Sequence, residues 1–266
     1  MSIRLTPEQT ERYSRQIMIP DLGGKGQIRL REGRALVIGA GGLGSPAAFY
    51  LAAAGIGVLG LVDSDRVELS NLQRQILHST ADLGREKVES ARETLERLNP
   101  EVKLRTHPVR LDEENAAEIF SGYDFIVDGS DNFATKFVVN DVAVGLGKAF
   151  SHAGIVRLQG QTMTVVPGKS ACYRCLFQDP PPPGEILNCQ QAGILGAVAG
   201  TIGSIQATEA IKYLVGMEEE LLIDRLLTYD AKTTRFRYVE VQRNPRCKAC
   251  GGNDSDAESS GRLREI

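Results

Sequence analysis

The stretch of sequence that decides the fold is ALVIGAGGLGSPAAFYLAAA, residues 35–54. Its first four residues form a short apolar run of the kind found in buried parallel strands. Gly39, Gly41 and Gly44 then fit the pattern G-x-G-x-x-G, with Gly42 between them, and the Ala-rich residues 45–54 predict a helix. Glycines let backbone N–H groups approach a phosphate at the positive end of a helix. The stretch therefore predicts a nucleotide-binding turn between a strand and a helix.

An acidic residue supports this prediction. Residues 58–62 predict the next strand, and Asp63 ends it roughly 20 residues beyond the glycines, where a carboxylate accepts hydrogen bonds from a ribose. The alternative is a glycine turn that only packs a helix on a strand, and the complete context argues against it. The nucleotide stays open, because dehydrogenases share this pattern.

Strands and helices alternate on both sides of this unit. Further strands are predicted at 102–106 and 125–127, and further helices at 26–32, 85–98, 113–120 and 132–146, besides an N-terminal helix that begins at Thr6-Pro7 and carries Arg12, Tyr13 and Arg15. The alternation predicts an α/β fold with a doubly wound, mostly parallel Rossmann-like sheet. Alternating polar and apolar residues at 161–166 and 235–241 predict additional antiparallel strands, and 192–215 predicts a long buried helix.

We expect one domain over residues 1–252, with a nucleotide-binding part at about 30–150 and a second part at about 151–252. The run from Asp179 to Gly184 contains four consecutive prolines and predicts a mobile loop. The polar residues 253–266 predict a disordered tail.

Basic residues beyond Asp63 favour ATP over a dinucleotide. Arg74 and Lys87 supply a planar fork and a point charge, which suit phosphates. A triphosphate needs such cations, because charge builds on the phosphorus under attack and on the departing pyrophosphate. The alternative is that both are surface residues.

An acidic turn follows the strand at 125–127. It reads Asp128-Gly-Ser-Asp131-Asn132, and an aspartate at the carboxyl end of a parallel strand lies in the ligand crevice, where it can hold Mg²⁺. The alternative for Asp131 is a helix N-cap before Asn132.

Two cysteine pairs predict a metal site. Cys172-Tyr-Arg-Cys175 and Cys247-Lys-Ala-Cys250 supply four thiolates for a tetrahedral Zn²⁺. Four protein ligands leave no position for substrate, so the predicted site is structural and clips two distant segments together. A redox-active pair is the competing interpretation.

At this point the sequence resembles the ThiF/MoeB family of ubiquitin-activating-like adenylyltransferases. The motifs that carry the resemblance are, in the family's order, Arg12-Tyr-Ser-Arg15-Gln16, the glycine turn, Asp63-Ser-Asp65, Ser70-Asn71-Leu-Gln-Arg74-Gln75, Lys87, Ser130-Asp131-Asn132 and both cysteine pairs. The resemblance covers about residues 8–252.

The resemblance implies an enzyme that activates the C-terminal Gly-Gly of a small ubiquitin-fold sulfur-carrier protein as an acyl-adenylate. It uses Mg·ATP and releases pyrophosphate, in sulfur transfer for molybdenum cofactor, thiamine or related biosynthesis. By the same resemblance Asp63 holds the ribose, Asp131 holds the metal, and Arg74 and Lys87 stabilise phosphate charge. Asn71 and Gln75 support them, and Asp65 and Asn132 belong to the nucleotide site. The family's homodimers imply that Arg15 reaches the triphosphate of the neighbouring subunit.

Cys189 is the remaining cysteine. One interpretation is a buried structural thiol. The other is a nucleophile that takes the activated carrier or sulfur, as the resemblance implies for some relatives. The histidines, His78, His107 and His152, show no triad or ligand spacing, and each is interpreted as a packing or surface residue rather than a catalyst.

Composition narrows the class of protein. The 266 residues carry a net charge of −3, which argues against nucleic-acid binding. No apolar run is long enough to span a membrane, and five cysteines without a signal peptide fit the cytoplasm. A NAD-dependent oxidoreductase is the alternative enzyme, but it leaves Arg74, Lys87 and Asp131 without a role. A non-catalytic nucleotide-binding scaffold is the third hypothesis.

Overall fold

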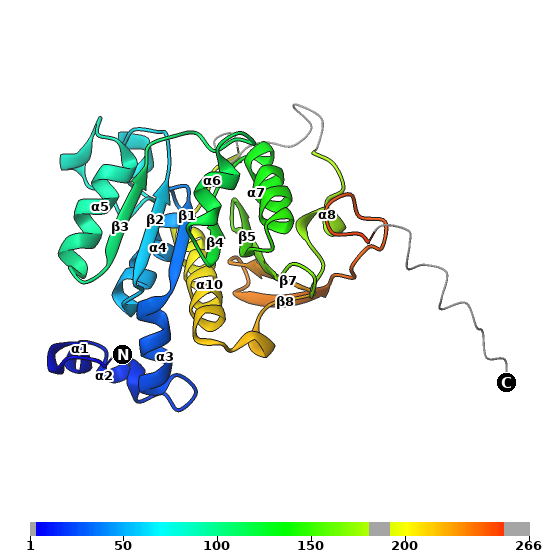
Figure 1. Ribbon diagram of the computed structural model, residues 1–266. Helices are drawn as coiled ribbons and strands as arrows, with labels where there is room; N and C mark the ends of the chain where they lie inside the picture. Colours follow the sequence, from blue (N-terminus) through cyan, green and yellow to red (C-terminus); the bar gives the residue numbers. More distant parts are fainter. Residues whose placement is uncertain (1–3, 181–191, 253–266) are drawn as a thin grey trace.

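The computed structural model describes residues 4–180 and 192–252. Its centre is one eight-stranded sheet with the strand order β3-β2-β1-β4-β5-β6-β7-β8 (Figure 1). The strands are β1 Arg34–Ile38, β2 Val58–Val62, β3 Lys103–His107, β4 Phe125–Asp128, β5 Ala149–Val156, β6 Gln159–Val165, β7 Arg225–Asp230 and β8 Arg235–Glu240.

The first five strands in this order are parallel. β1 pairs with β2 and β4, β2 also pairs with β3, and β4 also pairs with β5. This is the order of a doubly wound fold, in which ligands bind at the carboxyl ends of the strands where the strand order reverses, here between β1 and β4. β6, β7 and β8 are added in antiparallel fashion. The predicted fold class is confirmed.

Helices cover both faces of the sheet. One face packs against α4 (Gly44–Ala54), α5 (Lys87–Leu98) and α10 (Gly196–Val215), and the other against α6 (Ala116–Ser121) and α7 (Phe133–Gly145) (Figure 1). Within β1 the side chains alternate between these two layers, because successive residues of a strand point to opposite faces. Ala35 and Val37 lie in one hydrophobic cluster, and Leu36 and Ile38 lie in the other.

The N-terminal helix is shorter than predicted. It is divided into α1 (Pro7–Arg12) and α2 (Ser14–Ile17), with Tyr13 between them and α3 (Gly23–Glu32) after them. The Tyr13 ring packs onto Gly55, and its hydroxyl donates a hydrogen bond to Glu101 over 3.0 Å. This buried anchor fixes the N-terminal helices beside α4 and β3.

Two strands were not predicted. β5 and β7 lack a strongly apolar or alternating sequence, yet each pairs with a strand on both sides. The short helices η1 (Leu69–Asn71), η2 (Thr80–Asp82), α8 (Tyr173–Leu176) and η3 (Glu218–Glu220) complete the described elements. Most of the proline-rich loop and the predicted tail at 253–266 lie outside the described residues.

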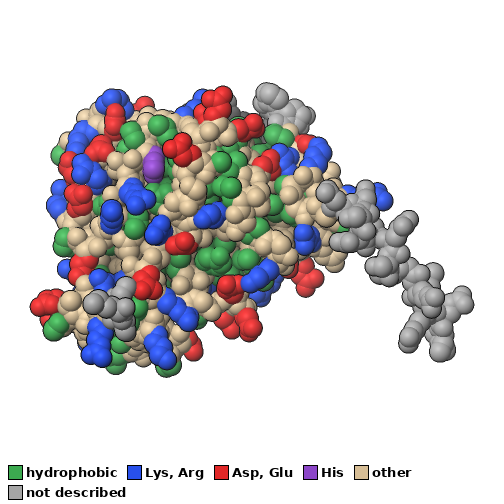
Figure 2. All heavy atoms as spheres, in the orientation of Figure 1, with side chains coloured by type: hydrophobic (Ala, Val, Ile, Leu, Met, Phe, Trp, Pro, Cys, Tyr) green, Lys and Arg blue, Asp and Glu red, His purple; other side chains and the backbone are tan. Residues whose placement is uncertain are grey.

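The surface carries mixed charge. On the face shown in Figure 2, basic and acidic side chains are interspersed, and apolar side chains appear between them. Along the described ranges, no helix is both long and apolar enough to cross a bilayer.

Candidate functional site

The glycine turn joins β1 to α4 at the carboxyl end of the parallel strands. Gly39 has a φ of +85°, in the left-handed region, and its N–H donates to the Val62 carbonyl over 2.7 Å. A Cβ on Gly44 would clash with the Gly39 carbonyl oxygen, so only glycine fits there. No side chain caps the start of α4. Ser45 donates to the Gly41 carbonyl and Pro46 has no N–H, so the backbone N–H groups left for a phosphate at this edge are those of the glycine turn itself, at 41–44.

Asp63 lies beside this turn, as the sequence predicted. Its carboxylate accepts hydrogen bonds from the N–H groups of Ala40 and Asp65, each over 2.8 Å. Burial raises the pKa of Asp63 above its usual value, although the positive charge of Lys87 and these N–H groups act in the opposite direction. The carboxylate thus fixes the glycine turn.

His78 also contacts the turn, and sequence reasoning missed this contact. Its Nε2 lies 2.9 Å from the Ala40 carbonyl oxygen and its Nδ1 lies 2.9 Å from Ser90 Oγ. Burial lowers the pKa of His78, so the neutral ring donates through Nε2 and accepts from Ser90. Of the two predicted interpretations, the surface residue is wrong, since the side chain is buried. No spacing signal pointed to this contact.

Arg74 and Gln75 border the glycine turn, and Asn71 begins the bend that carries them. The Arg74 stem lies against Gly42, and its guanidinium donates to the Ser70 carbonyl over 3.0 Å. The Gln75 side chain lies against Gly41, and its buried Oε1 has no hydrogen-bond partner among the described residues. Asn71 Oδ1 accepts from the Glu68 N–H over 3.2 Å and so closes the bend that carries the other two. The structure brings Arg74 and Gln75 to the glycine turn, and Asn71 supports the bend that holds them.

The first turn of α10 reaches the same place. A Cβ on Gly196 would clash with the Gln73 carbonyl, and a Cβ on Gly42 would lie 3.4 Å from the Ala199 Cβ. The sequence predicted α10 as a buried helix but gave no sign that it begins at the glycine turn. No side chain caps the N-terminus of α10, at Leu195.

Lys87 is the first residue of α5, and its side chain points toward the carboxylates of Asp63 and Asp65. Its side chain is 6% exposed, and Nζ lies 2.8 Å from Asp65 Oδ2. The alternative that Lys87 is a surface residue is therefore wrong. Asp65 itself is 68% exposed, so this ion pair borders solvent at the edge of the site.

The two aspartates of the turn after β4 lie in different surroundings. Asp128 is 1% exposed, whereas Asp131 is exposed. Asn132 caps α7, because its Oδ1 accepts from the Thr135 N–H over 2.9 Å, and the alternative that Asp131 is the cap is wrong. Gly129 packs against Gly39, so this turn adjoins the glycine turn. Asp131 is thus an exposed carboxylate at the carboxyl edge of the sheet, and carboxylate oxygens are suitable ligands for Mg²⁺.

Arg15 does not join these residues within one chain. Its neighbour Gln16 donates to the Ala54 carbonyl over 3.0 Å, at the last residue of α4. The glycine turn lies at the first residue of the same helix. Arg15 is therefore at the far end of α4 from the site.

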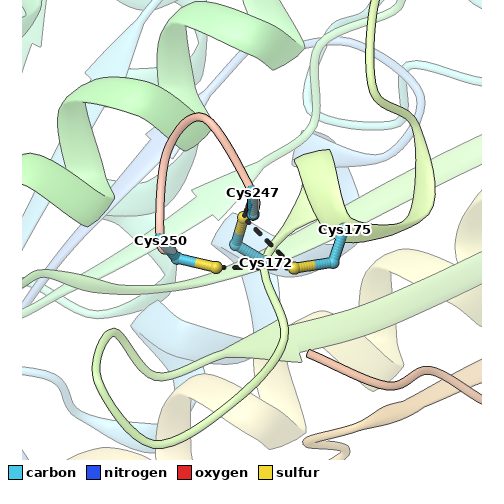
Figure 3. A group of neighbouring side chains, drawn as sticks. All are labelled: Cys172, Cys175, Cys247 and Cys250. Carbon is cyan, nitrogen blue, oxygen red and sulfur yellow. Dashed lines mark hydrogen bonds between the residues drawn. The ribbon is translucent and has the colours of Figure 1, made fainter. Parts of the chain in front are cut away.

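The four paired cysteines converge on one point. Their sulfur atoms all lie within 4.8 Å of one another, with 3.6 Å between Cys172 and Cys247 and 3.4 Å between Cys175 and Cys250 (Figure 3). Tetrahedral zinc with Zn–S bonds of ~2.3 Å places its sulfurs about 3.8 Å apart. Burial acts to raise the pKa of Cys247, but backbone N–H groups of Cys250 and Ala249 outweigh it and lower the pKa to about 7, whereas burial raises the pKa of Cys172 and of Cys250. The charge of a bound zinc ion would hold all four as thiolates. The cluster fits a structural zinc ion, and Cys189 lies outside the described residues.

Comparison with known proteins agrees with this arrangement. The model of the ThiF family matches residues 13–249. The chain is 46% identical over 261 residues to a sulfur carrier protein adenylyltransferase of Thermus thermophilus, covering 96% of each chain. It is also 46% identical to the SAMP-activating enzyme E1 of Haloferax volcanii, covering 97% of this chain and 94% of that protein.

Other relatives are longer or more distant. A probable adenylyltransferase/sulfurtransferase MoeZ of Mycobacterium tuberculosis is 46% identical over 245 residues, and the match spans 62% of its length. Among solved structures, E. coli MccB with ATP has a TM-score of 0.79 at 25% sequence identity, covering 91% of this chain and 75% of that one.

Proposed function

The chain belongs to the ThiF family, and on that premise we propose that it is an ATP-dependent adenylyltransferase. Its substrate is the C-terminal Gly-Gly carboxylate of a small ubiquitin-fold sulfur-carrier protein. Two relatives that match over nearly their whole length support this substrate class by their names, the sulfur carrier protein adenylyltransferase and the SAMP-activating enzyme E1. Residues 1–252 act as a single unit, and the sulfur carried serves molybdenum cofactor, thiamine or related biosynthesis.

The proposed reaction is a displacement at the α-phosphorus of ATP. A carboxylate oxygen of the carrier forms a bond to the α-phosphorus, the bond to the pyrophosphate oxygen breaks, and acyl-adenylate and pyrophosphate result. No side chain of the enzyme needs to bond to phosphorus. Positioning and electrostatic stabilisation therefore supply the rate.

Each residue at the glycine turn has a part in this proposal. Gly39, Gly41, Gly42 and Gly44 let backbone N–H groups reach the phosphates, and Asp63 binds the ribose. Arg74 and Lys87 neutralise charge on the α-phosphate and on the departing pyrophosphate, with Asn71, Asp65, Gln75 and Asn132 completing the site. Asp63 bonds to the glycine turn, Arg74 lies against it, and Lys87 pairs with Asp65 beside it. This arrangement is the observation that carries the proposal.

Magnesium fits the exposed carboxylate after β4. Asp131 would hold the ion, which supplies charge neutralisation on the phosphates when bound. The buried Asp128 is unsuited to this role, because its carboxylate is occupied by protein donors. The four cysteines would hold zinc as a structural clip that takes no part in the reaction.

A homodimer would complete the site with Arg15 of the neighbouring subunit. The groove between α4 and α10 supports this part of the proposal. It has a volume of about 330 Å³, and its lining includes Gln16, Tyr50 and Thr208 and no charged side chain among the described residues. Gln16 adjoins Arg15, so an interface along these helices would carry Arg15 into a second subunit.

Exchange of labelled pyrophosphate into ATP, in the presence of candidate carriers, tests the proposal. We expect carrier-dependent exchange by the native chain and a loss of about 10²–10³-fold in Arg74→Ala and in Asp131→Ala, because each removes a charge that acts in the transition state. Arg97→Ala, an exposed arginine at the end of α5, is the matched control and keeps native exchange. Reduction of NAD without exchange would favour the oxidoreductase, and nucleotide binding without turnover would favour the scaffold.

A further inference from the structure

An ion pair is buried beneath the turn that carries Asp131. Asp128, at the end of β4, is 1% exposed, and the Lys136 side chain from α7 is 8% exposed. Lys136 Nζ lies 3.3 Å from Asp128 Oδ2 and donates to the Ala153 carbonyl over 2.6 Å. His152 Nδ1 from β5 lies 3.2 Å from the same carboxylate oxygen. One carboxylate therefore joins three elements of the fold.

The other oxygen of Asp128 holds the turn itself. Oδ1 accepts from the Ser130 N–H over 3.0 Å and from the Ser130 hydroxyl over 2.5 Å. Ser130 precedes Asp131 directly, and Asn132 on its other side caps α7. Asp131 is thus placed between two fixed neighbours.

A buried ion pair is a poor device for stability alone. Desolvation of two charges offsets most of their attraction, and well-packed apolar residues in their place are often as stable. Through its contact with Ser130, this ion pair also determines the position of the turn. The Asp128 carboxylate can hold the turn only while its own direction is fixed. Lys136 and His152 fix that direction from the opposite side.

We propose that Asp128 and Lys136 are positioning residues that hold the turn at 129–132 so that Asp131 is presented to the metal–nucleotide complex. The inference rests on the proposed function, in which Asp131 is the metal ligand. Groups behind a metal ligand orient it, and their removal weakens metal binding.

The same group connects the turn to the four-cysteine cluster. The His152 and Tyr173 rings pack with their centroids 4.3 Å apart, and Tyr173 follows the cluster residue Cys172. The Tyr173 N–H donates to Asn140 Oδ1 on α7, the helix that also carries Lys136. The positioning group is therefore anchored on the segment that the metal clip would hold.

Binding of Mn²⁺ to the chain in the presence of ATP, followed by electron paramagnetic resonance without any carrier protein, tests the inference. Ser130→Ala removes one contact to the turn and keeps both charges. The double variant Asp128→Leu/Lys136→Met removes both charges together, so that neither is left unpaired. We expect Mn²⁺ affinity to fall about tenfold or more in both variants.

Glu209→Gln is the matched control. Like Asp128, Glu209 is a buried carboxylate, with 2% of its side chain exposed, and it pairs with Lys212. It accepts hydrogen bonds from the Thr164 hydroxyl and the Leu222 N–H, but it lies on α10 away from the turn. We expect this variant to lower the melting temperature and to keep native Mn²⁺ affinity. Hydrogen exchange of the amides at 129–132 should be faster in the first two variants only.

Native Mn²⁺ affinity and native exchange protection in both test variants would overturn the inference. A native chain that binds Mn²⁺ with ATP but shows no pyrophosphate exchange with any carrier would contradict the proposed function and not this positioning role. A native chain that binds no Mn²⁺ with ATP would contradict both.

Discussion

Most polar side chains beside the glycine turn have a partner that fixes their direction. Asp63 is held by the Ala40 N–H, and His78 holds the carbonyl of the same residue. Lys87 is held by Asp65. Such preorganisation lowers the cost of arranging dipoles when charge develops on a phosphate.

The sequence predicted those site residues that stand at a fixed, short spacing from one another in the chain. The glycines and the cysteine pairs are of this kind, and the structure gathers each set at one place. His78 and Lys136 were not predicted, because their contacts depend on burial and on elements that meet only in the folded chain. The Ala40 carbonyl, for example, is 38 residues from His78.

Buried His152 predicts a loss of stability in acid. Burial and the nearby Lys136 charge lower its pKa to about 4, although the Asp128 carboxylate acts in the opposite direction. The unfolded chain, with an ordinary histidine pKa of about 6.5, takes up a proton that the folded chain does not. The free energy of unfolding should therefore fall between pH 6.5 and 4, by up to about 3 kcal/mol from this group.

Urea unfolding of the native chain and of His152→Gln across this pH range measures the effect. The variant should show a shallower dependence on pH, since it lacks the imidazole that takes up a proton in the unfolded chain and not in the folded one. Equal slopes in the two proteins would contradict the assignment.

The cysteine segments act as one clip between elements that are distant in the chain. Cys172 and Cys175 lie at the N-cap of α8 and within it, and the other pair follows β8, so zinc would close a loop of most of the second part of the chain. Closing a long loop stabilises the fold mainly by restricting the unfolded chain.

Cys172→Ser should therefore lose zinc and about 4 kcal/mol of stability, by analogy with a cross-link over a loop of this length. At this size the melting temperature should fall by roughly 10 °C. Zinc analysis and calorimetry provide the measurements, with Lys248→Ala, an exposed residue within the second cysteine pair, as the control that retains both zinc and melting temperature. Full stability of Cys172→Ser without zinc would refute the clip.

The elements were predicted unevenly for physical reasons. The parallel strands β1, β2 and β4 are buried on both faces and read as apolar runs, so their sequence is distinctive. β5 contains Ser151, His152 and Gly154 and was missed, because its polar groups are satisfied by partners from β4, β6 and α10 that no local pattern reveals.

The molecule as a whole places Arg15 and the glycine turn at opposite ends of α4. The doubly wound order was predictable from alternating strands and helices, but this separation was not, because it depends on how the N-terminal helices dock through Tyr13. If Arg15 acts in the reaction, a second subunit must supply it.

Mixing two inactive variants tests this subunit sharing. Arg15→Ala and Asp131→Ala should each be inactive alone. After unfolding and refolding together, statistical pairing makes about half of the dimers mixed, each with one complete site, so about a quarter of native activity should return. Recovery of no activity, with mixed dimers present by mass spectrometry, would contradict a site shared between subunits.

The central claim is that a carrier carboxylate attacks the α-phosphorus of ATP at this glycine turn. A carrier labelled with ¹⁸O in its C-terminal carboxylate, incubated with ATP and the chain and then treated with hydroxylamine to cleave the acyl bond, tests it most directly. Mass spectrometry should find one ¹⁸O atom in the released AMP, because the bridging oxygen comes from the carboxylate. Formation of ADP, or of AMP without the label, would contradict the claim.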